Sequence, residues 1–400
     1  MRILTFCQYY YPEPFLIHDI MEELVKRGHE VYVITGIPNY PTGNIYNGYT
    51  GGSWIEETIN GVKIIRCPIV PRGKTIGKLF VNYISYMYLG TKACKRLVGE
   101  FDVCFCYQLT PITQLYPAIK YKNKKKIPLV SYNLDLAPMS GSAKIGHFIM
   151  EPYTKFSKWA MNSCDKVLVT SESFIEYNNT INQVPIEKME YLPQHASDEL
   201  LNINMESKDN GIFDFMFAGN VGWGIRHQVM VNAAKTLVKK QDNFLIHIVG
   251  DGSALESFEN DVHKEGLDDK FVFWGRQSRE KMPEFYSKAD ALLITLRKDQ
   301  TTVPGKLQTY MTTGKPIFGA MDGSGSKVIS DAKCGVCVQA EDSKGLAEVM
   351  LSYMRNEQAY VNCGKNGKDF FEKNFTLKRF MDRFESILEE ISVAMSRELI

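Results

Sequence analysis

The sequence has little net charge, and this absence excludes one class of partner. Its 47 Lys and Arg residues are almost balanced by 46 Asp and Glu, so the formal net charge at pH 7 is +1 over 400 residues. A chain that mainly holds nucleic acid carries a clear basic excess. We therefore expect no nucleic-acid partner.

The sequence also lacks paired cysteines, a secretory signal and a long apolar run. Its nine cysteines are an odd number and lie mostly within apolar runs, as Cys104 and Cys106 do; this is typical of buried thiols in a reducing compartment. No metal-ligand spacing accompanies them, so we expect no metal and no cofactor. No small-residue cleavage site follows the N-terminus, and no stretch reaches the roughly 18 apolar residues of a membrane span. We expect a cytoplasmic protein, or one peripheral on the inner face of the cell membrane.

Positive charge is present, but it is concentrated in one region. Residues 61–130 contain thirteen Lys or Arg and only two acids, Glu100 and Asp102. Basic residues beside aromatic ones favour an amphipathic helix on an anionic membrane surface. The alternative is a core-facing aromatic stripe with a solvated basic edge. The residues concerned are Phe80, Tyr83, Tyr86 and Tyr88, then Lys92, Lys95 and Arg96, with Lys120–Lys126 in the same half.

Strand and helix patterns alternate along the chain. Residues 2–7 are an apolar run, residues 17–25 place apolar side chains on one helix face, and residues 30–35 are a second apolar run. This order predicts a βαβ unit. Further apolar runs predict strands at 102–107, 128–133, 166–170, 213–218, 244–249, 271–274, 291–296, 316–320 and 335–338.

One break in the alternation predicts a domain boundary. Residues 196–211 are polar and have no periodicity, so we expect an interdomain linker there. The prediction is an α/β fold of two Rossmann-like domains facing a central cleft, at residues 1–200 and 201–375. A final helix at 376–400 is expected to pack back on the N-terminal domain. Ligands of such sheets bind beyond the carboxyl ends of the strands.

Two glycine-rich loops follow predicted strands of the second half. The first contains Gly219, Asn220 and Gly222, and the second is Gly250-Asp251-Gly252. Glycines allow backbone amides to approach a phosphate, although a tight turn with no ligand explains them equally well. Arg226 is predicted in the first turn of the next helix, where a cation is unfavourable unless an anion neutralises it.

A third loop gives the strongest signal. Pro304, Gly305 and Lys306 begin a predicted helix, so free backbone amides and an ammonium lie at one helix N-terminus. Two such anion-binding loops in one domain suit a diphosphate. In the first half, Asp135 follows a buried strand, where it either binds sugar hydroxyls or caps a turn.

These motifs resemble bacterial family-4 retaining glycosyltransferases, and most closely the L-fucosamine transferase branch of O-antigen and capsule synthesis. The similarity runs from end to end. It is carried by YYYPE at 9–13, ELVKRGHEV at 23–31, PNYP at 38–41, PRG at 71–73, NYIS at 82–85, DLAP at 135–138, TVPGKLQTYM at 302–311, GKP at 314–316 and DG at 322–323.

The resemblance implies a GT-B fold, a UDP-sugar donor held by the C-terminal domain, and no required metal. It places Gly219, Asn220 and Arg276 at the donor, and residues 305–308, including Leu307, near phosphate and ribose. Asp135 is implied to face the reacting sugar. The implied acceptor is a polyprenyl-diphosphate-linked glycan, used in surface polysaccharide synthesis.

Among the departures of the chain from the family pattern, one concerns a pair of glutamates at the donor site. Many family-4 enzymes carry two glutamates separated by seven intervening residues, and Gln300 and Gln308 stand here instead. Both are still predicted to contact the donor. Two other functions therefore stay open: a nonhydrolysing UDP-sugar 2-epimerase and a catalytically silent GT-B partner subunit. The sequence argues against an NAD dehydrogenase, because no GxGxxG with an acidic residue beyond it follows the first strand.

Overall fold

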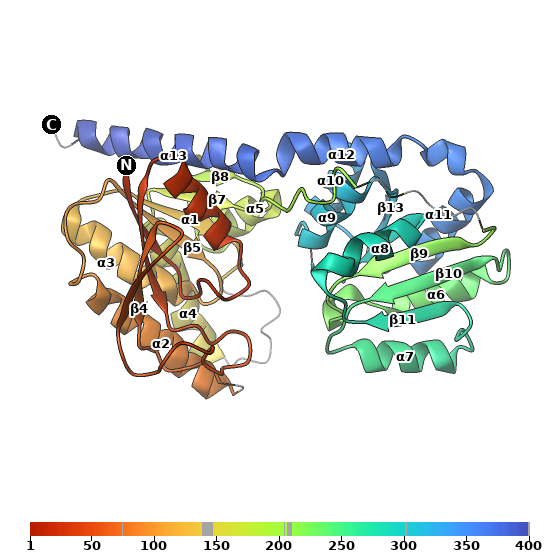
Figure 1. Cartoon of the computed structure of the whole chain (residues 1–400), viewed down its shortest axis with the longest axis horizontal. Coiled ribbons are helices and arrows are strands. Elements are labelled where there is room, and N and C mark those ends of the chain that lie inside the picture. The colour runs from red at the N-terminus through yellow and green to blue at the C-terminus, as the bar shows by residue number, and fades with distance from the viewer. Residues whose placement is uncertain (74, 138–146, 204, 206–209, 301, 399–400) are drawn as a thin grey trace. The chain divides into compact units, whose positions relative to one another are not determined.

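The chain folds into two compact α/β units. The computed structural model describes residues 1–73, 75–137, 147–203, 205, 210–300 and 302–398. Unit 1 comprises Met1–Pro193 together with Phe380–Ile400, and unit 2 comprises Gln194–Arg379. Each unit contains one sheet covered by helices on both faces (Figure 1). The structure thus confirms the prediction of two Rossmann-like folds.

Unit 1 is built on an eight-stranded sheet in the order β3-β4-β2-β1-β5-β6-β7-β8. All neighbouring strands are parallel except β3 and β4. The core strands are fully buried apolar runs, as expected for a parallel sheet with helices on both faces. The strands are β1 (Arg2–Phe6), β2 (Glu30–Gly36), β3 (Ile55–Ile59), β4 (Val62–Cys67), β5 (Val103–Gln108), β6 (Leu129–Asn133), β7 (Lys166–Val169) and β8 (Met189–Tyr191).

Strands β3 and β4 form a hairpin that the sequence analysis does not predict. Their turn is Asn60-Gly61, and both residues have positive φ, 48° and 82°. An Asn-Gly pair between two short strands is the strongest local hairpin signal, because this turn type needs positive φ at both positions. The signal was present, but half-buried β3 is too polar to read as a core strand.

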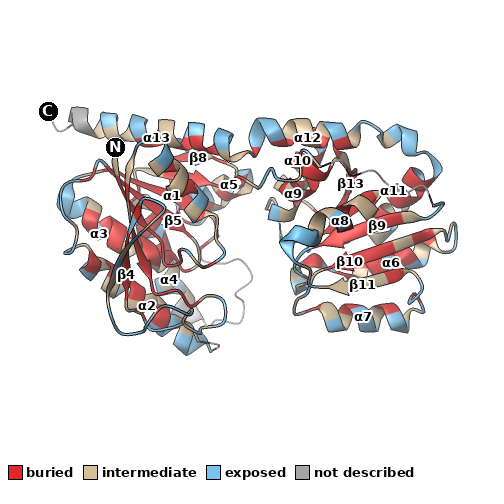
Figure 2. Cartoon of the chain, viewed as in Figure 1, coloured by how far each residue is buried: buried red, intermediate tan, exposed pale blue. Residues whose placement is uncertain are grey.

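The helices of unit 1 pack on both faces of its sheet, so the central strands β1, β2, β5, β6 and β7 are mostly buried (Figure 2). The C-terminal helix α13 joins one of these layers. The Phe384 ring lies 4.7 Å from that of Phe105, and Phe380 lies 5.6 Å from Tyr132. This confirms that the last helix packs on the N-terminal domain. The helices are α1 (Ile17–Lys26), α2 (Ile76–Ala93), α3 (Leu115–Lys125), α4 (His147–Asn162), α5 (Glu172–Thr180) and α13 (Leu377–Glu398).

Unit 2 contains a six-stranded, all-parallel sheet in the order β11-β10-β9-β12-β13-β14. Numbered within the unit, this is 3-2-1-4-5-6, the Rossmann order. The strands are β9 (Phe213–Ala218), β10 (Phe244–Val249), β11 (Phe271–Gly275), β12 (Ala291–Thr295), β13 (Ile317–Ala320) and β14 (Gly335–Val338). The helices are α6 (Gln228–Leu237), α7 (Leu255–Lys264), α8 (Met282–Lys288), α9 (Gly305–Thr313), α10 (Ser324–Ala332), α11 (Ser343–Arg355) and α12 (Cys363–Asn374).

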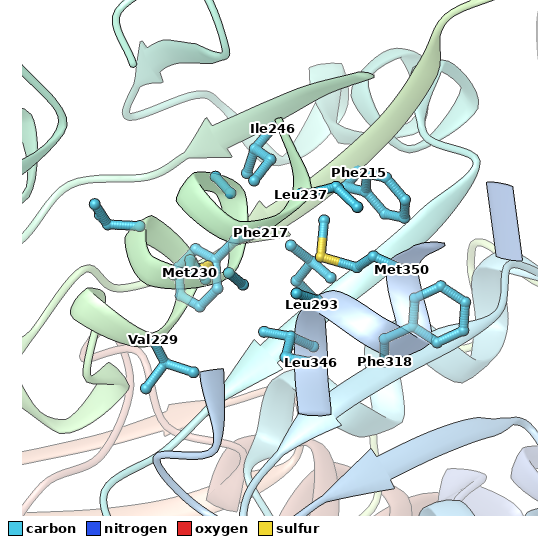
Figure 3. Packing of buried hydrophobic residues seen from close by; sticks show 14 of the residues in the cluster. Phe215, Phe217, Val229, Met230, Leu237, Ile246, Leu293, Phe318, Leu346 and Met350 are labelled. Atoms are coloured by element: carbon cyan, nitrogen blue, oxygen red, sulfur yellow. The ribbon is translucent and has the colours of Figure 1, made fainter. Parts of the chain in front are cut away.

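Alternating residues of each strand fill the two cores of unit 2. Phe215 and Phe217 of β9 pack against α6 and α11 on one face (Figure 3). Met216 and Ala218 point to the opposite face, against α8, α9, α10 and α12. This alternation is the period-two geometry of a strand.

The stretch expected as a linker is largely part of unit 2. The boundary between the units lies after Pro193. Beyond it, the Ala196 amide donates to the Phe375 carbonyl, and Leu200 and Leu201 pack against the core. Residues 204 and 206–209 of this stretch lie outside the described residues.

All nine cysteines are free thiols, six of them fully buried. Burial raises the pKa of Cys104 and Cys106 well above the usual thiol value, which keeps them protonated and inert. Among the helices that the structure describes, none combines the length and apolar character needed to cross a membrane.

Candidate functional site

A cavity of about 540 Å³ opens at the carboxyl edge of the unit 2 sheet. Its walls come from the ends of β9, β10 and β11 and from the first turns of α8 and α9. It lies beside β9, where the strand order reverses between β9 and β12. This is the position at which doubly wound sheets bind ligands. Of the predicted site residues, the structure brings six to this cavity: Gly219, Asn220, Gly250, Asp251, Arg276 and Lys306.

The two glycine-rich loops interlock, backbone against backbone. A Cβ on Gly250 would lie 1.9 Å from the Gly219 carbonyl oxygen, and one on Gly252 would lie 2.5 Å from the Val221 oxygen. The Val221 amide also donates to the Asp251 carbonyl at 2.9 Å. Gly250 and Gly252 are therefore required for packing between loops. Their presence does not by itself indicate a phosphate, so the evidence for an anion comes from the cations.

Lys306 projects from the first turn of α9 toward the glycine loop. Its Nζ lies 3.8 Å from the centroid of the Phe217 ring and 3.3 Å from where a Cβ on Gly219 would stand. Within the described residues, no carboxylate pairs with it. Burial lowers the pKa of Lys306 to about 7, because an ammonium without a counter-ion is unfavourable away from water. An anion in the cavity would relieve this penalty.

The remaining polar groups of the cavity lie at its rim. Arg276 is exposed just after β11, and the described chain provides no ion pair for it. Asp251 is also exposed, and its Oδ1 accepts a hydrogen bond from the Gly252 amide at 2.7 Å. Two cations thus face one acid, and the α9 N-terminus adds partial positive charge. The cavity is electropositive.

The structure does not bring Arg226 or Gly222 to the cavity. The expectation that Arg226 lies in a first helical turn is wrong: Gly222 precedes a single 3-10 turn, η3 (Trp223–Ile225), and α6 begins only after it. Arg226 has a φ of +51°. It is half-exposed and pairs with Glu341, Nε to Oε1 at 3.1 Å. The pairing with Glu341, 115 residues away, explains its charge without an anion.

Gln300 and Gln308, which stand where many family-4 enzymes have glutamates, have different surroundings. Gln300 is exposed, and its side chain lies against Gly224, whose Cβ position is 2.7 Å from Gln300 Nε2. Gln308 is buried and donates from Nε2 to the Gln194 carbonyl at 2.7 Å. Neither lines the cavity. Gln308 instead ties α9 to the first residue of unit 2.

The other predicted residues of the third loop serve the helix itself. Pro304 is the N-cap of α9, and Gly305 opens it, with no atom within 4 Å of its Cβ position. Leu307 is fully buried in the core between α9 and the sheet, so its side chain does not contact the cavity. The Lys306 side chain alone carries charge from this loop into the cavity.

Sequence reasoning missed the aromatic and aliphatic part of the wall. Met282 and Tyr286 of α8 and Thr309 of α9 line the cavity. Tyr310 supports it from behind: its hydroxyl donates to the Ala218 carbonyl and accepts from the Ala218 amide, at 3.0 and 2.7 Å. These bonds hold the end of β9 just before the glycine loop. Thr309 follows Lys306 by one turn of the predicted helix. This spacing was the one sequence feature that could have placed Thr309 at the cavity.

Asp135 lies in unit 1, at the carboxyl end of β6. Its Oδ2 accepts a hydrogen bond from the Thr110 amide at 2.8 Å, and the side chain is half-buried. A network behind it links Asn133 to the Asp135 carbonyl and to Asn178. Both readings from sequence therefore remain compatible with its position: it holds a loop, and its second carboxylate oxygen has no hydrogen bond within the described residues.

The aromatic stripe of α2 divides between core and surface. Tyr86 is fully buried and its hydroxyl donates to the Ile34 carbonyl, so it belongs to the core. Ile76, Phe80, Val81 and Tyr88 are exposed. At the end of this helix, Lys92 Nζ lies 4.3 Å from the Tyr88 ring centroid. We call these four exposed residues the α2 apolar surface.

A search of the described residues for three or more His, Cys, Asp or Glu side chains grouped as metal ligands finds none. Asp251, the acid at the rim of the cavity, is hydrogen-bonded within its own loop to the Gly252 amide.

Two protein-family models match the chain, one in each half. Residues 16–194 match "Glycosyltransferase Family 4", and residues 202–370 match "Glycosyl transferases group 1". The boundary between the matches coincides with the boundary between the two units.

Relatives with known names are distant but span most of the chain. N-acetyl-alpha-D-glucosaminyl L-malate synthase of Bacillus anthracis is 20% identical over 396 residues, covering 93% of this chain and 92% of that protein. A glycosyl transferase named for colanic acid biosynthesis in Escherichia coli (strain K12) is 23% identical over 344 residues, covering 78% and 82%. The solved structure of Anabaena HepE in complex with UDP has a TM-score of 0.71 at 12% identity, covering 98% of this chain and 100% of that one. This last likeness shows the fold.

Proposed function

The chain belongs to the GT-B glycosyltransferases of family 4, and we propose that it transfers a sugar from a UDP-sugar to a lipid-linked glycan with retention of configuration. The sugar we favour is an N-acetylated amino or deoxyamino hexose, and the product belongs to surface polysaccharide synthesis. In this proposal unit 2 binds the donor and unit 1 recognises the acceptor.

One observation carries the donor assignment: the half-buried Lys306 ammonium faces the cavity without a carboxylate among the described residues. A diphosphate provides the missing negative charge, and the N-terminus of α9 provides backbone donors for it. The UDP complex of HepE, which shares the fold, supports a nucleotide diphosphate in such a site. Arg276 and Asn220 at the rim are then donor contacts.

The proposed reaction breaks the bond between the anomeric carbon and the diphosphate oxygen. A glycosidic bond forms on the same face between that carbon and an acceptor hydroxyl oxygen. The hydroxyl proton passes to the departing phosphate oxygen, and UDP is released. Lys306 stabilises the charge that grows on the leaving diphosphate, as prepositioned cations do in such reactions. No metal is required in this scheme.

For the acceptor side we propose that Asp135 binds a hydroxyl of the reacting sugar. One of its carboxylate oxygens accepts from the Thr110 amide, and the other has no hydrogen-bond partner among the described residues. The polysaccharide role rests on the relative named for colanic acid biosynthesis, and the choice of a lipid-linked acceptor on the sequence resemblance.

The donor assignment is tested by thermal unfolding with UDP, GDP, ADP or CMP, in EDTA. A ligand that binds only the native state raises its stability by mass action. We expect stabilisation by UDP alone. Stabilisation by GDP would change the donor, and no response would favour a silent partner subunit. Release of free UDP only when an acceptor is present would exclude the nonhydrolysing 2-epimerase, whose product is another UDP-sugar.

We further propose that unit 1 docks on the anionic inner face of the membrane through the α2 apolar surface. Exposed aromatic residues followed by Lys92 suit an interface of lipid tails and anionic headgroups. Flotation with phosphatidylglycerol vesicles at low salt should recover the protein. Phe80→Ser should weaken recovery, whereas Val361→Ser, an equally exposed apolar residue in unit 2, should not. Equal recovery of both variants would contradict this docking surface.

A further inference from the structure

An aromatic cluster lies at the carboxyl edge of the unit 1 sheet, in the loops after β1 and β2. The rings of Tyr9, Phe15 and Tyr40 lie within 5.0 to 5.5 Å of one another. Tyr9 is buried, whereas Phe15 and Tyr40 are half-buried and so keep an accessible side. Aromatic rings of this kind pack against the apolar faces of sugar rings while hydroxyls point outward.

Arg72, in the loop after β4, lies against this cluster. Its guanidinium is 5.2 Å from the centroid of the Tyr40 ring, and its Nη1 donates to the Tyr9 hydroxyl at 3.2 Å. The Arg72 amide donates to the Asn39 side-chain oxygen at 2.7 Å, which fixes the loop. Burial raises the pKa of Tyr83, and Arg72 lies close enough to its hydroxyl to oppose that shift. Among the described residues, the Arg72 side chain is therefore held in place by neutral groups.

This environment distinguishes Arg72 from the other arginines of unit 1. Each of the others whose side chain is described has a carboxylate within 4 Å: Arg2 has Glu30, Arg27 has Glu385, Arg66 has Glu57, Arg96 has Glu56 and Arg383 has Glu190. Arg72 has no carboxylate partner among the described residues. It is half-buried; burial opposes its charge, but the neighbouring Tyr9 and Tyr83 outweigh this and raise the pKa of Arg72, so the guanidinium stays charged.

The nearby acid does not fill this role. Glu13 is fully buried, and its two carboxylate oxygens accept hydrogen bonds from the amides of Tyr10, Asn39 and Tyr40. These bonds use Glu13 to fix the loops that carry the aromatic cluster. The planar fork of Arg72 therefore keeps N–H donors beyond the one given to Tyr9, and such a fork matches a phosphate with two parallel bonds.

We propose that Arg72 binds a phosphate group attached to the acceptor sugar, while the sugar ring packs on the Phe15 and Tyr40 rings. This inference rests on the proposed function, because it assigns the acceptor to unit 1. It adds a specificity: the acceptor is a sugar phosphate or diphosphate, and the neutral sugar alone is a poor ligand.

The test compares two soluble probes, N-acetylglucosamine 1-phosphate and N-acetylglucosamine, by calorimetric titration. The protein is first saturated with UDP, so that Lys306 is already occupied. Charge-assisted hydrogen bonds of this kind should favour the phosphorylated probe by about tenfold or more. Arg72→Gln should abolish that preference, and Arg72→Lys, which keeps charge but loses the fork, should retain part of it. Arg96→Gln, which removes an arginine paired with Glu56, is the matched control and should leave it unchanged.

Each outcome decides the proposal. The proposal is overturned if the wild type prefers neither N-acetylglucosamine 1-phosphate nor a short-chain prenyl diphosphate sugar over N-acetylglucosamine, or if the preference is undiminished in Arg72→Gln. If Arg72→Gln fails to fold, an undiminished preference in Arg72→Lys would overturn it equally. A third probe, a short-chain prenyl diphosphate sugar, separates the sources: Arg72-dependent binding of this probe alone indicates a lipid diphosphate, and binding of both indicates any sugar phosphate.

The result is separable from the donor assignment. If UDP does not bind, the titrations are repeated with Lys306→Ala, which removes the cation of the unit 2 cavity. An Arg72-dependent preference for the phosphorylated probe would then stand although the proposed donor had failed.

Discussion

The sheets of unit 1 and unit 2 share a central strand order, yet the loops at their carboxyl edges differ in composition. In unit 2 the edge carries glycine loops packed backbone to backbone, with Lys306 and Arg276 at a cavity. In unit 1 the edge carries an aromatic cluster, buried amides and the acid Asp135. Glycines allow close approach to a phosphate chain, whereas rings and a carboxylate suit a sugar and its hydroxyls.

The difference shows how the same strand order can serve the binding of two different ligands. The strand order fixes only where ligands bind, since helix N-termini and loops gather at the carboxyl edge of any such sheet. The side chains after each strand then select the ligand. Changes at one edge should accordingly affect one ligand and leave the other unaffected, and the following predictions test this separation.

The largest effect is expected from Lys306→Ala. Loss of the cation that stabilises the leaving diphosphate should lower turnover by about 10²- to 10³-fold. The thermal unfolding midpoint should change little, since burial makes this charge costly to the free protein. Steady-state kinetics and thermal unfolding measure both, with exposed Lys344→Ala in α11 as control. Wild-type turnover in the variant would contradict the assignment.

Asp135→Asn should act at the carboxyl edge of the unit 1 sheet. Asparagine can still accept from the Thr110 amide, so the fold is kept, but the negative charge facing the sugar is lost. We expect about a 10²-fold lower kcat/KM, the scale of a misplaced reactant, with an unchanged Kd for UDP. Asp102→Asn, at an exposed acid of unit 1, should leave both unchanged. A weakened UDP affinity in Asp135→Asn would break the proposed division between the two edges.

Gly250→Ala should show that the unit 2 glycines are needed for packing. The added Cβ would lie 1.9 Å from the Gly219 carbonyl oxygen, and φ at this position is +143°. We expect about 2 kcal/mol or more of destabilisation, measured by urea unfolding. Gly305→Ala is the control, because nothing lies within 4 Å of its Cβ position and it begins a helix; its effect should stay within about 1 kcal/mol. Equal stabilities of the two variants would show that the two glycine loops can move apart to admit a Cβ without loss of stability.

The smallest effect concerns pH. The pKa of Lys306 is about 7 in the free protein, and a bound diphosphate raises it, because an anion favours the ammonium. Below pH 7 the lysine is already charged, so UDP affinity should be nearly constant. From pH 7 to 8 affinity should fall about fivefold, because binding must then take up a proton. Calorimetry across this range measures it. Lys306→Arg should remove the pH dependence; a slope that persists there would assign it to another group.

Sequence patterns located most of the fold because parallel strands are buried on both faces. Eleven apolar runs became strands, with ends shifted by at most one or two residues, as at 291–296 for β12. Three strands were missed. Strand β3 lies at the sheet edge with one face in water, β4 carries the charged residues Lys63 and Arg66 within its apolar run, and β8 has only three residues. The misses therefore follow from exposure, interrupting charges and length, the features on which an apolar run depends.

The sequence by itself determined the two Rossmann-like sheets, the positions of the glycine loops and the start of α9 at Pro304, because these depend on local patterns and turn chemistry. Only the tertiary structure decided what each charged side chain contacts. It paired Arg226 with Glu341, turned Gln308 toward Gln194, and left Lys306 and Arg72 without acids among the described residues. A charge acts through space, so its partner can lie more than a hundred residues away and leaves no trace in the local sequence.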